Sequence, residues 1–342
     1  MEGSSLRRSA FVLFVGLGVL CATTAWGDPD GVPAGIATDG GAYWRIDPAT
    51  KTVSFAPMLV WDRDAGNRSM RLCPGKGFDS ARADEVVAEL ALEPAPMVLY
   101  FLETPEEGTG LARLAETAER LDFHVFITAV SDADAARLAG FAKLPPLGLG
   151  CGSEFTDAGM AYLPKLGDVQ VLATDSEQLT DAGMAHLAGL TRLESLTIMC
   201  PHVTEAGLSN LAGLRALEDL YLLSPPVSDA GLRSVAQVRA LRRLALDGAR
   251  VTDAGLEQLS GLAGLEELTL NAPLVTDAGL AHLAKLPRLE TLDVTGAKLT
   301  AAGVKLLAEL PSLRYLGLRD TGLSAAEAKA LEAAYPSLQI RP

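Results

Sequence analysis

A repeat of 24 residues constrains this chain more than any other feature. The stretch 251–298 holds two copies of one unit, VTDAGLEQLSGLAGLEELTLNAPL and VTDAGLAHLAKLPRLETLDVTGAK. A 25-residue unit opens at Val130, and units of 24 then start at Phe155, Leu179, Val203, Val227, Val251, Val275, Leu299 and Leu323. A period of this length is typical of a solenoid, in which each unit buries its apolar face only by stacking on its neighbours.

Each unit predicts one helix followed by one strand. The Thr or Ser at the second position can cap the helix, and the Asp or Glu after it complements the helix dipole. The glycine two places later is costly inside a helix, so we expect it to allow close approach between neighbouring units. The strand follows as L-x-x-L-x-L, as in Leu265, Leu268 and Leu270, of which the last two point inward. A row of carboxylates could also collect cations, but helix capping explains it without a ligand.

This strand pattern, with the opening V-T-D-A-G-L, resembles the leucine-rich repeat family and within it the bacterial subclass with GALA-like (T-D-A-G-L) repeats of 24 residues. The resemblance covers residues 130–342. It implies an α/β fold, a right-handed horseshoe-shaped solenoid with a parallel sheet on the concave side and helices on the convex side. The family places Asn, Cys or Thr three residues after the last strand leucine, and here only Thr321 fits. The other positions hold Glu177, Pro201, Pro225, Ala249, Pro273 and Ala297.

The residues before the repeats divide into three segments. Residues 1–27 predict a signal peptide, since Arg7 and Arg8 precede the apolar run 10–22 and a cleavage motif precedes Asp28. An uncleaved membrane anchor over 10–22 is the alternative. Residues 28–79 predict a flexible N-terminus with a β-hairpin at 42–55, and residues 80–130 predict degenerate repeats or an N-terminal cap before the solenoid at 131–342. A small separate α/β domain is the alternative for 80–130.

Within these segments we expect strands at 58–61, 97–102 and 124–130 and helices at 86–92 and 111–121. After cleavage three cysteines remain, Cys73, Cys151 and Cys200, so at least one lacks an intramolecular partner. Cys151 and Cys200 share a repeat position two units apart, which separates them by roughly 10 Å and excludes a disulfide between them. A bond between Cys73 and Cys151 stays open.

Charge and motifs narrow the function classes. The net charge of −14 argues against nucleic-acid binding, which needs a basic surface, and against anionic membranes. The chain has no H-E-x-x-H, C-x-x-C or G-x-S-x-G motif, and its histidines, His124, His186, His202 and His282, are dispersed. We therefore expect no catalytic residues, no metal site and no cofactor, and a protein that is not an enzyme.

The candidate site is the concave face, where residues alternating with the inward leucines form rows across the strands. Met199, Tyr221 and Leu223 are expected to form an exposed apolar patch beside Arg243 and Asp247, a mixture that is typical of interface centres. An ordinary mixed surface is the alternative. The candidate partner-binding residues are Met199, Tyr221, Leu223, Arg243, Asp247, Glu267, Asn271, Asp293, Tyr315 and Arg319.

The sequence therefore predicts an exported, periplasmic or extracellular, non-enzymatic binding protein whose partner is a protein or a cell-surface polymer. It predicts no nucleic-acid partner and no membrane contact after signal cleavage. Two alternatives remain open. Residues 28–130 could form a small catalytic or sensory domain to which the repeats present a substrate, or, by analogy with the family, the chain could be a substrate adaptor of the ubiquitin-ligase type. The ligand's identity and the oligomeric state do not follow from the sequence.

Overall fold

The structure is a computed structural model that describes residues 45–46, 53–54, 58–61, 68–72, 78–91, 97–101, 104–121, 123–224, 227–246 and 250–341. The predicted signal peptide at 1–27, with its alternative as an anchor at 10–22, lies outside these residues, as do Cys73 and Asp247. The chain forms two compact units, Met1–Thr174 and Asp175–Pro342.

The first unit contains a short hairpin and a mostly parallel sheet. In the hairpin, β1 (Arg45–Ile46) pairs antiparallel with β2 (Val53–Ser54). The sheet order is β3 (Met58–Trp61), β4 (Arg68–Leu72), β5 (Met97–Phe101), β6 (Phe123–Val130), β7 (Leu147–Cys151) and β8 (Val169–Thr174). Only the β3–β4 pair in this order is antiparallel, so the parallel strands of the repeats continue back to β4. The helices are α2 (Ser80–Leu90), α3 (Thr109–Ala115), α4 (Ala118–Leu121), α5 (Asp132–Leu138), α6 (Asp157–Met160) and the 3-10 helix η1 (Leu163–Leu166).

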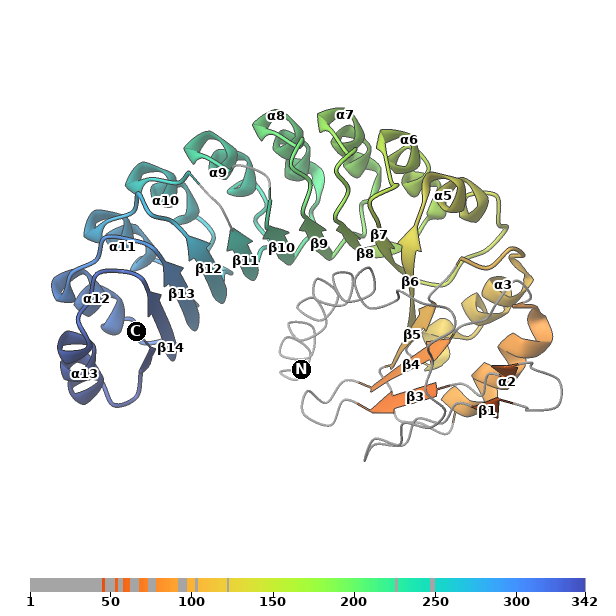
Figure 1. Ribbon diagram of the computed structural model, residues 1–342, viewed down its shortest axis with the longest axis horizontal. Coiled ribbons are helices and arrows are strands. Elements are labelled where there is room, and N and C mark those ends of the chain that lie inside the picture. Colours follow the sequence, from red (N-terminus) through yellow and green to blue (C-terminus); the bar gives the residue numbers. More distant parts are fainter. Residues whose placement is uncertain are drawn as a thin grey trace. The chain divides into compact units, whose positions relative to one another are not determined.

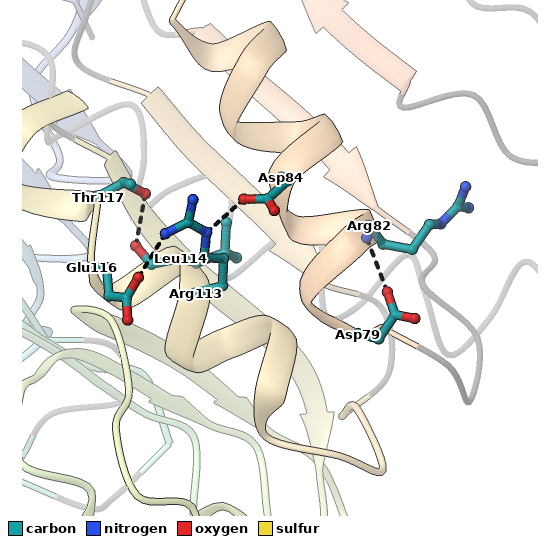
Figure 2. Close-up of polar contacts among 7 residues, drawn as sticks. All are labelled: Asp79, Arg82, Asp84, Arg113, Leu114, Glu116 and Thr117. Atoms are coloured by element: carbon teal, nitrogen blue, oxygen red, sulfur yellow. Dashed lines mark hydrogen bonds and ion pairs between the residues drawn. The ribbon is translucent and has the colours of Figure 1, made fainter.

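The strands predicted at 58–61, 97–102 and 124–130 are confirmed to within one residue, whereas both predicted helices differ from the expectation. The helix predicted at 86–92 starts earlier, at Ser80, because the Asp79 carboxylate accepts a hydrogen bond from the Arg82 amide (3.0 Å). The helix predicted at 111–121 is divided into α3 and α4, and the Thr117 hydroxyl donates to the Leu114 carbonyl at the break (3.1 Å). Figure 2 shows both bonds, and it shows Arg113 of α3 reaching Asp84 of α2 (2.5 Å) and Glu116 (2.7 Å).

The second unit repeats one coil of strand and helix. Each strand pairs in parallel with the next along the chain, and Figure 1 shows that within this unit the strands line the inner side of the curve and the helices the outer side. The strands are β9 (Ser195–Ile198), β10 (Asp219–Leu222), β11 (Arg243–Leu246), β12 (Glu267–Asn271), β13 (Thr291–Thr295), β14 (Tyr315–Arg319) and β15 (Gln339–Arg341). The helices are α7 (Asp181–Met184), η2 (Ala185–Gly189), α8 (Glu205–Leu208), η3 (Ser209–Gly213), α9 (Asp229–Val235), α10 (Asp253–Leu259), α11 (Asp277–Leu283), α12 (Ala301–Ala308) and α13 (Ala325–Ala334).

This architecture is the α/β solenoid of leucine-rich repeats, and the leucines occupy the places that the pattern predicts. Leu265, Leu268 and Leu270 are 0–1% exposed between strand and helix. The helix stripe of Leu280, Leu283 and Leu286 is equally buried. Alternate strand residues consequently form the inner face of the sheet.

Acidic residues that follow the capping threonine or serine join successive coils. In the second unit, for example, one carboxylate oxygen of Asp253 accepts from the Thr276 amide (2.8 Å) and the other from the Thr276 hydroxyl (2.7 Å). The Thr276 hydroxyl in turn accepts from the Ala278 amide and so caps α11. We call this series the aspartate ladder; its rungs are Asp132–Thr156, Asp181–Thr204, Glu205–Ser228, Asp229–Thr252, Asp253–Thr276 and Asp277–Thr300. The carboxylates thus bind the next coil, in addition to lying at helix starts as predicted.

The repeated glycine makes room for this ladder. A Cβ atom on Gly207 would overlap the Asp181 carboxylate, and one on Gly303 would overlap Asp277 in the same way. The close approach of neighbouring units that the sequence predicted is confirmed. Where Glu205 replaces aspartate, the contact relaxes, and the nearest Glu205 atom lies 3.6 Å from the Cβ position of Gly231.

The Asn, Cys or Thr side chains that stabilise the turn after each strand in leucine-rich repeats are missing at most of these positions. Hydrogen bonds between backbone groups of neighbouring coils pair the peptide groups of the turn instead. The Ala272 amide donates to the Thr295 carbonyl (3.0 Å), and the Gly296 amide donates to the Arg319 carbonyl (2.9 Å). Thr321, which does fit the family pattern, donates its hydroxyl to the Leu318 carbonyl (3.1 Å). Pro273 and Ala297 can therefore occupy turn positions without leaving these peptide groups unpaired.

The ladder predicts a dependence of stability on pH. Burial acts to raise the pKa of Asp181, but hydrogen bonds from the Thr204 hydroxyl and from the amides of Thr204 and Gly207 outweigh it and hold the pKa below its ordinary value of 3.8. A lowered folded-state pKa contributes stability that is present above the unfolded-state pKa and is lost as the pH falls through the folded-state pKa. We expect urea titrations between about pH 6 and about pH 3 to show a flatter decline for Asp181→Asn than for the wild type. Glu257→Gln, which changes an exposed carboxyl on α10, is the control, and an unchanged slope in Asp181→Asn would contradict the prediction.

Candidate functional site

The inner face of the second unit brings the predicted rows together in the expected register. Asp219 pairs with Ser195 on one side and with Arg243 on the other, and Arg243 pairs with Glu267. The row continues through Thr291 to Tyr315. The second row is Thr197, Tyr221, Ala245, Thr269, Asp293 and Gly317. This register follows from the constant length of the repeat, which returns each strand to the same position.

A buried ion pair lies on β10 and β11 of this face. The Arg243 guanidinium donates to the Asp219 carboxylate at 2.6 Å, and their side chains are 2% and 3% exposed. Burial alone would lower the pKa of Arg243, but the charge of Asp219 and the hydrogen bond to it raise the pKa above its ordinary value. A buried charge persists only with such compensation, so the pair fixes the position of the Arg243 side chain.

Tyr221 lies beside this pair, on the same face of β10 as Asp219. Burial raises the pKa of the Tyr221 hydroxyl, and the negative charge of Asp219 raises it further. The hydroxyl therefore stays protonated at neutral pH, and it accepts a hydrogen bond from Arg243.

The apolar patch differs from the expectation in its exposure. Met199, Tyr221 and Leu223 are half-buried and Arg243 is buried, whereas the sequence pattern predicted an exposed group. Leu223 follows β10 and its amide donates to the Ile198 carbonyl (3.0 Å), which holds it beside the end of β9. Asp247, the remaining member of the predicted patch, lies outside the described residues.

The other predicted residues lie on β12, β13 and β14. Glu267, Asn271, Asp293 and Tyr315 are half-buried and Arg319 is exposed. Asn271 and Arg319 belong to a third row, in which both pair with Thr295. The structure thus assembles all the described candidates on one sheet face, with its buried end at β9–β11 and its open end at β12–β14.

The described residues include histidines, cysteines and carboxylates on several elements. No group of three or more His, Cys, Asp or Glu side chains among them is placed to hold a metal ion. His186 and His282 lie on η2 and α11, on the helix side of the unit. Cys151 and Cys200 are buried at 1% and 0% exposure. None of the described helices is both long and apolar enough to cross a membrane.

Two features of the site were not recognised from the sequence. Asp219 is not among the candidate residues, although its opposite charge one repeat before Arg243 indicates an ion pair across neighbouring strands. Thr269 and Thr291 were likewise omitted, yet they lie next to Asp293 and Glu267 on the open end of the face. Only the strand position of these two threonines could have indicated them, because threonine is common on strands in general.

The chain was compared with protein-family models, curated proteins and solved structures. No protein-family model and no curated protein matches the chain. The chain is similar to an internalin (inlF) from Listeria monocytogenes, with 21% identity and a TM-score of 0.45 over 70% of this chain and 71% of that one. It is also similar to the plant peptide hormone receptor RGFR1, solved in complex with RGF2, with 14% identity and a TM-score of 0.35 over 66% of this chain and 35% of the receptor. The assignment of the fold rests on the strand register and the aspartate ladder, not on these likenesses.

Proposed function

We propose that this protein is a non-enzymatic binding protein that captures its partner on the inner face of the second unit. The observation that carries the proposal is the group on β10 and β11, where the half-buried Tyr221 lies beside the buried Asp219–Arg243 pair. Tyr is among the residue types that most often dominate binding energy.

The pre-ordering of this group supports the proposal. The buried Arg243 side chain holds the Tyr221 hydroxyl through a hydrogen bond, so less conformational entropy of Tyr221 is lost when a partner binds. Met199 and Leu223 add half-buried apolar surface at the ends of β9 and β10. The open end of the face, with Asn271, Tyr315 and Arg319, supplies polar groups of the kind found at an interface rim.

The partner we propose is a protein, with a cell-surface polymer as the second candidate. The signal pattern of residues 1–27 supports export and hence a partner outside the cytoplasm. The net charge of −14 disfavours nucleic acid as the partner.

The test is capture with the mature chain, residues 28–342, from lysate and surface fractions of the source organism. We expect Tyr221→Glu with Leu223→Glu to reduce capture by more than about 100-fold, because both changes place a negative charge in the half-buried apolar group of Met199, Tyr221 and Leu223. The far-UV circular dichroism should stay unchanged. Prior protease treatment of the fractions separates the candidates, since it abolishes capture of a protein and leaves capture of a polymer intact.

The control is Leu306→Glu, which adds one charge of the same sign at a 44% exposed position on α12. It should leave capture unaltered. Undiminished capture by the Tyr221 and Leu223 variant would exclude this face as the binding site.

A further inference from the structure

Asp175, the first residue of the second unit, lies in the row of the inner face that holds Met199 and Leu223. It follows β8 directly, and Met199 and Leu223 occupy the same repeat position one and two coils later. Successive coils are spaced by about 4.8 Å along a parallel sheet. The row therefore places the Asp175 carboxyl group beside two half-buried apolar side chains.

The Asp175 carboxyl group is shielded from water without a compensating partner. Its Oδ1 atom is buried and has no hydrogen-bond partner among the described residues. Burial raises the pKa of Asp175, and the hydrogen bond from its own amide opposes this rise only in part. The ion pairs in the described part of the chain all involve other carboxylates. A carboxylate in this state costs free energy in the folded protein.

Other shielded carboxylates of this unit are compensated by the fold itself. Asp181 accepts hydrogen bonds from the Thr204 amide and hydroxyl, which hold its pKa below the ordinary value although burial acts to raise it. Asp219 accepts from the Arg243 guanidinium at 2.6 Å. Asp175 lacks compensation of this kind, and it borders the apolar group of the proposed binding face. Desolvated titratable groups of this kind cluster at functional sites, where a ligand can supply the missing partner.

The group that best complements Asp175 is a lysine ammonium. A cation restores the favourable electrostatic environment that burial has removed, and its N–H group can donate to Oδ1. Only one carboxylate oxygen is buried without a partner, which suits the compact ammonium of lysine better than the planar fork of arginine. The aliphatic stem of a lysine also needs apolar surface next to the charge, and Met199 and Leu223 provide it in the same row.

We propose that Asp175 anchors a lysine side chain of the bound protein partner, whose ammonium group donates to Oδ1 while its aliphatic stem lies over Met199 and Leu223. This inference rests on the proposed function, because it names the chemistry that the same face recognises. It also gives a role to a charge that otherwise only destabilises the folded chain.

The test uses two small probes on the full mature chain, phenethylammonium and phenethyl alcohol, which share a phenyl ring and a two-carbon linker and differ in the charge. Binding is measured by NMR titration at neutral pH in about 0.15 M salt, where charges beyond about 8 Å are screened. We expect the wild type to bind phenethylammonium roughly fivefold more tightly than the alcohol, and Asp175→Asn to abolish this difference. The matched control is Glu177→Gln, which removes the same charge from an exposed position two residues later and should leave phenethylammonium affinity within about twofold.

A stability measurement separates an anchor from a structural carboxylate. A carboxyl group whose folded-state pKa is raised destabilises the fold above that pKa, and the penalty disappears as the pH falls to the unfolded-state pKa. Asp175→Asn should therefore raise the midpoint of urea denaturation at neutral pH while it weakens binding of the cationic probe. A lowered midpoint would show that the carboxylate serves the fold and would overturn the proposal.

Equal affinity of the wild type for the two probes would overturn the proposal, and so would equal losses in Asp175→Asn and Glu177→Gln. An equal loss of both probes in Asp175→Asn would overturn it as well, because an anchor for a cation acts only on the charged probe. The outcome is separate from that of the capture experiment. Equal affinity for both probes, with capture lost in the Tyr221 and Leu223 variant, would reject the anchor and leave the binding face in place.

Discussion

Replacing Gly207 by alanine should lower the free energy of unfolding by about 3 kcal/mol, which is large for the addition of one methyl group. The new Cβ atom would overlap one carboxylate oxygen of Asp181 and lie 3.2 Å from its carboxyl carbon. The Asp181 carboxylate would then lose the hydrogen bonds that it now accepts from the Thr204 amide (2.7 Å) and the Thr204 hydroxyl (2.6 Å). Overpacking and the loss of charge-assisted bonds between coils add in the same direction. Urea denaturation followed by circular dichroism measures the change.

Two further variants isolate this mechanism. Gly213→Ala is the matched control, because a Cβ atom at Gly213 meets nothing within 4 Å, and it should be neutral or slightly stabilising. In the background of Asp181→Ala, the Gly207→Ala change should cost much less, since the overlapping carboxylate is gone. Additive costs of the two changes would show that Gly207 acts independently of the ladder.

Replacing Leu268 by alanine should cost a similar amount, about 3 kcal/mol, by a different mechanism. Leu268 is 0% exposed on β12, and it pairs in register with Leu244 and Leu292, so its removal leaves a cavity between three strands of the solenoid. Because each coil contacts only its neighbours, the loss should also weaken the coupling between the coils before and after it. Calorimetry or denaturant titration should show a broader transition as well as a lower midpoint.

The control for this change lies in the same coil. Leu274 is 53% exposed after β12, and Leu274→Ala should change the free energy of unfolding by no more than about 0.5 kcal/mol. Equal costs at Leu268 and Leu274 would contradict the assignment of the core.

The leucine pattern and the strand register could be predicted from the sequence because both depend on periodicity alone. A constant repeat of 24 residues places Arg243 beside Asp219 and Glu267 wherever the coils stack, and the structure confirms that pairing. Helix ends were predicted less well. The start of α2 depends on the bond that the Asp79 side chain accepts, and the break before α4 depends on the Thr117 hydroxyl, and neither bond alters the pattern of apolar residues.

The aspartates show what periodicity could not reveal. Their place after the capping threonine was explained by the helix dipole, which is a local effect. Their bonds to the next coil depend on how closely two helices approach, and this distance is set by the glycines and by packing across coils. The burial of Arg243 is likewise a property of the assembled face, so a row position could predict its neighbours but not its exposure.

The aspartate ladder also makes the coils interchangeable. Each coil of the type 251–274 carries an aspartate whose carboxylate binds the following coil. It also carries a threonine and a glycine that contact the aspartate of the preceding coil, so any two such coils can stack on each other. If residues 251–274 were excised, Asp229 would meet Thr276 and Gly279, which have the same geometry as its present partners Thr252 and Gly255. Whole coils can therefore be gained or lost by recombination while the buried leucines of the remaining coils still pack against one another. Loss of the coil 251–274 would remove β12 and place β13 beside β11, which would shorten the inner face and so the length of partner that the proposed binding face could accommodate.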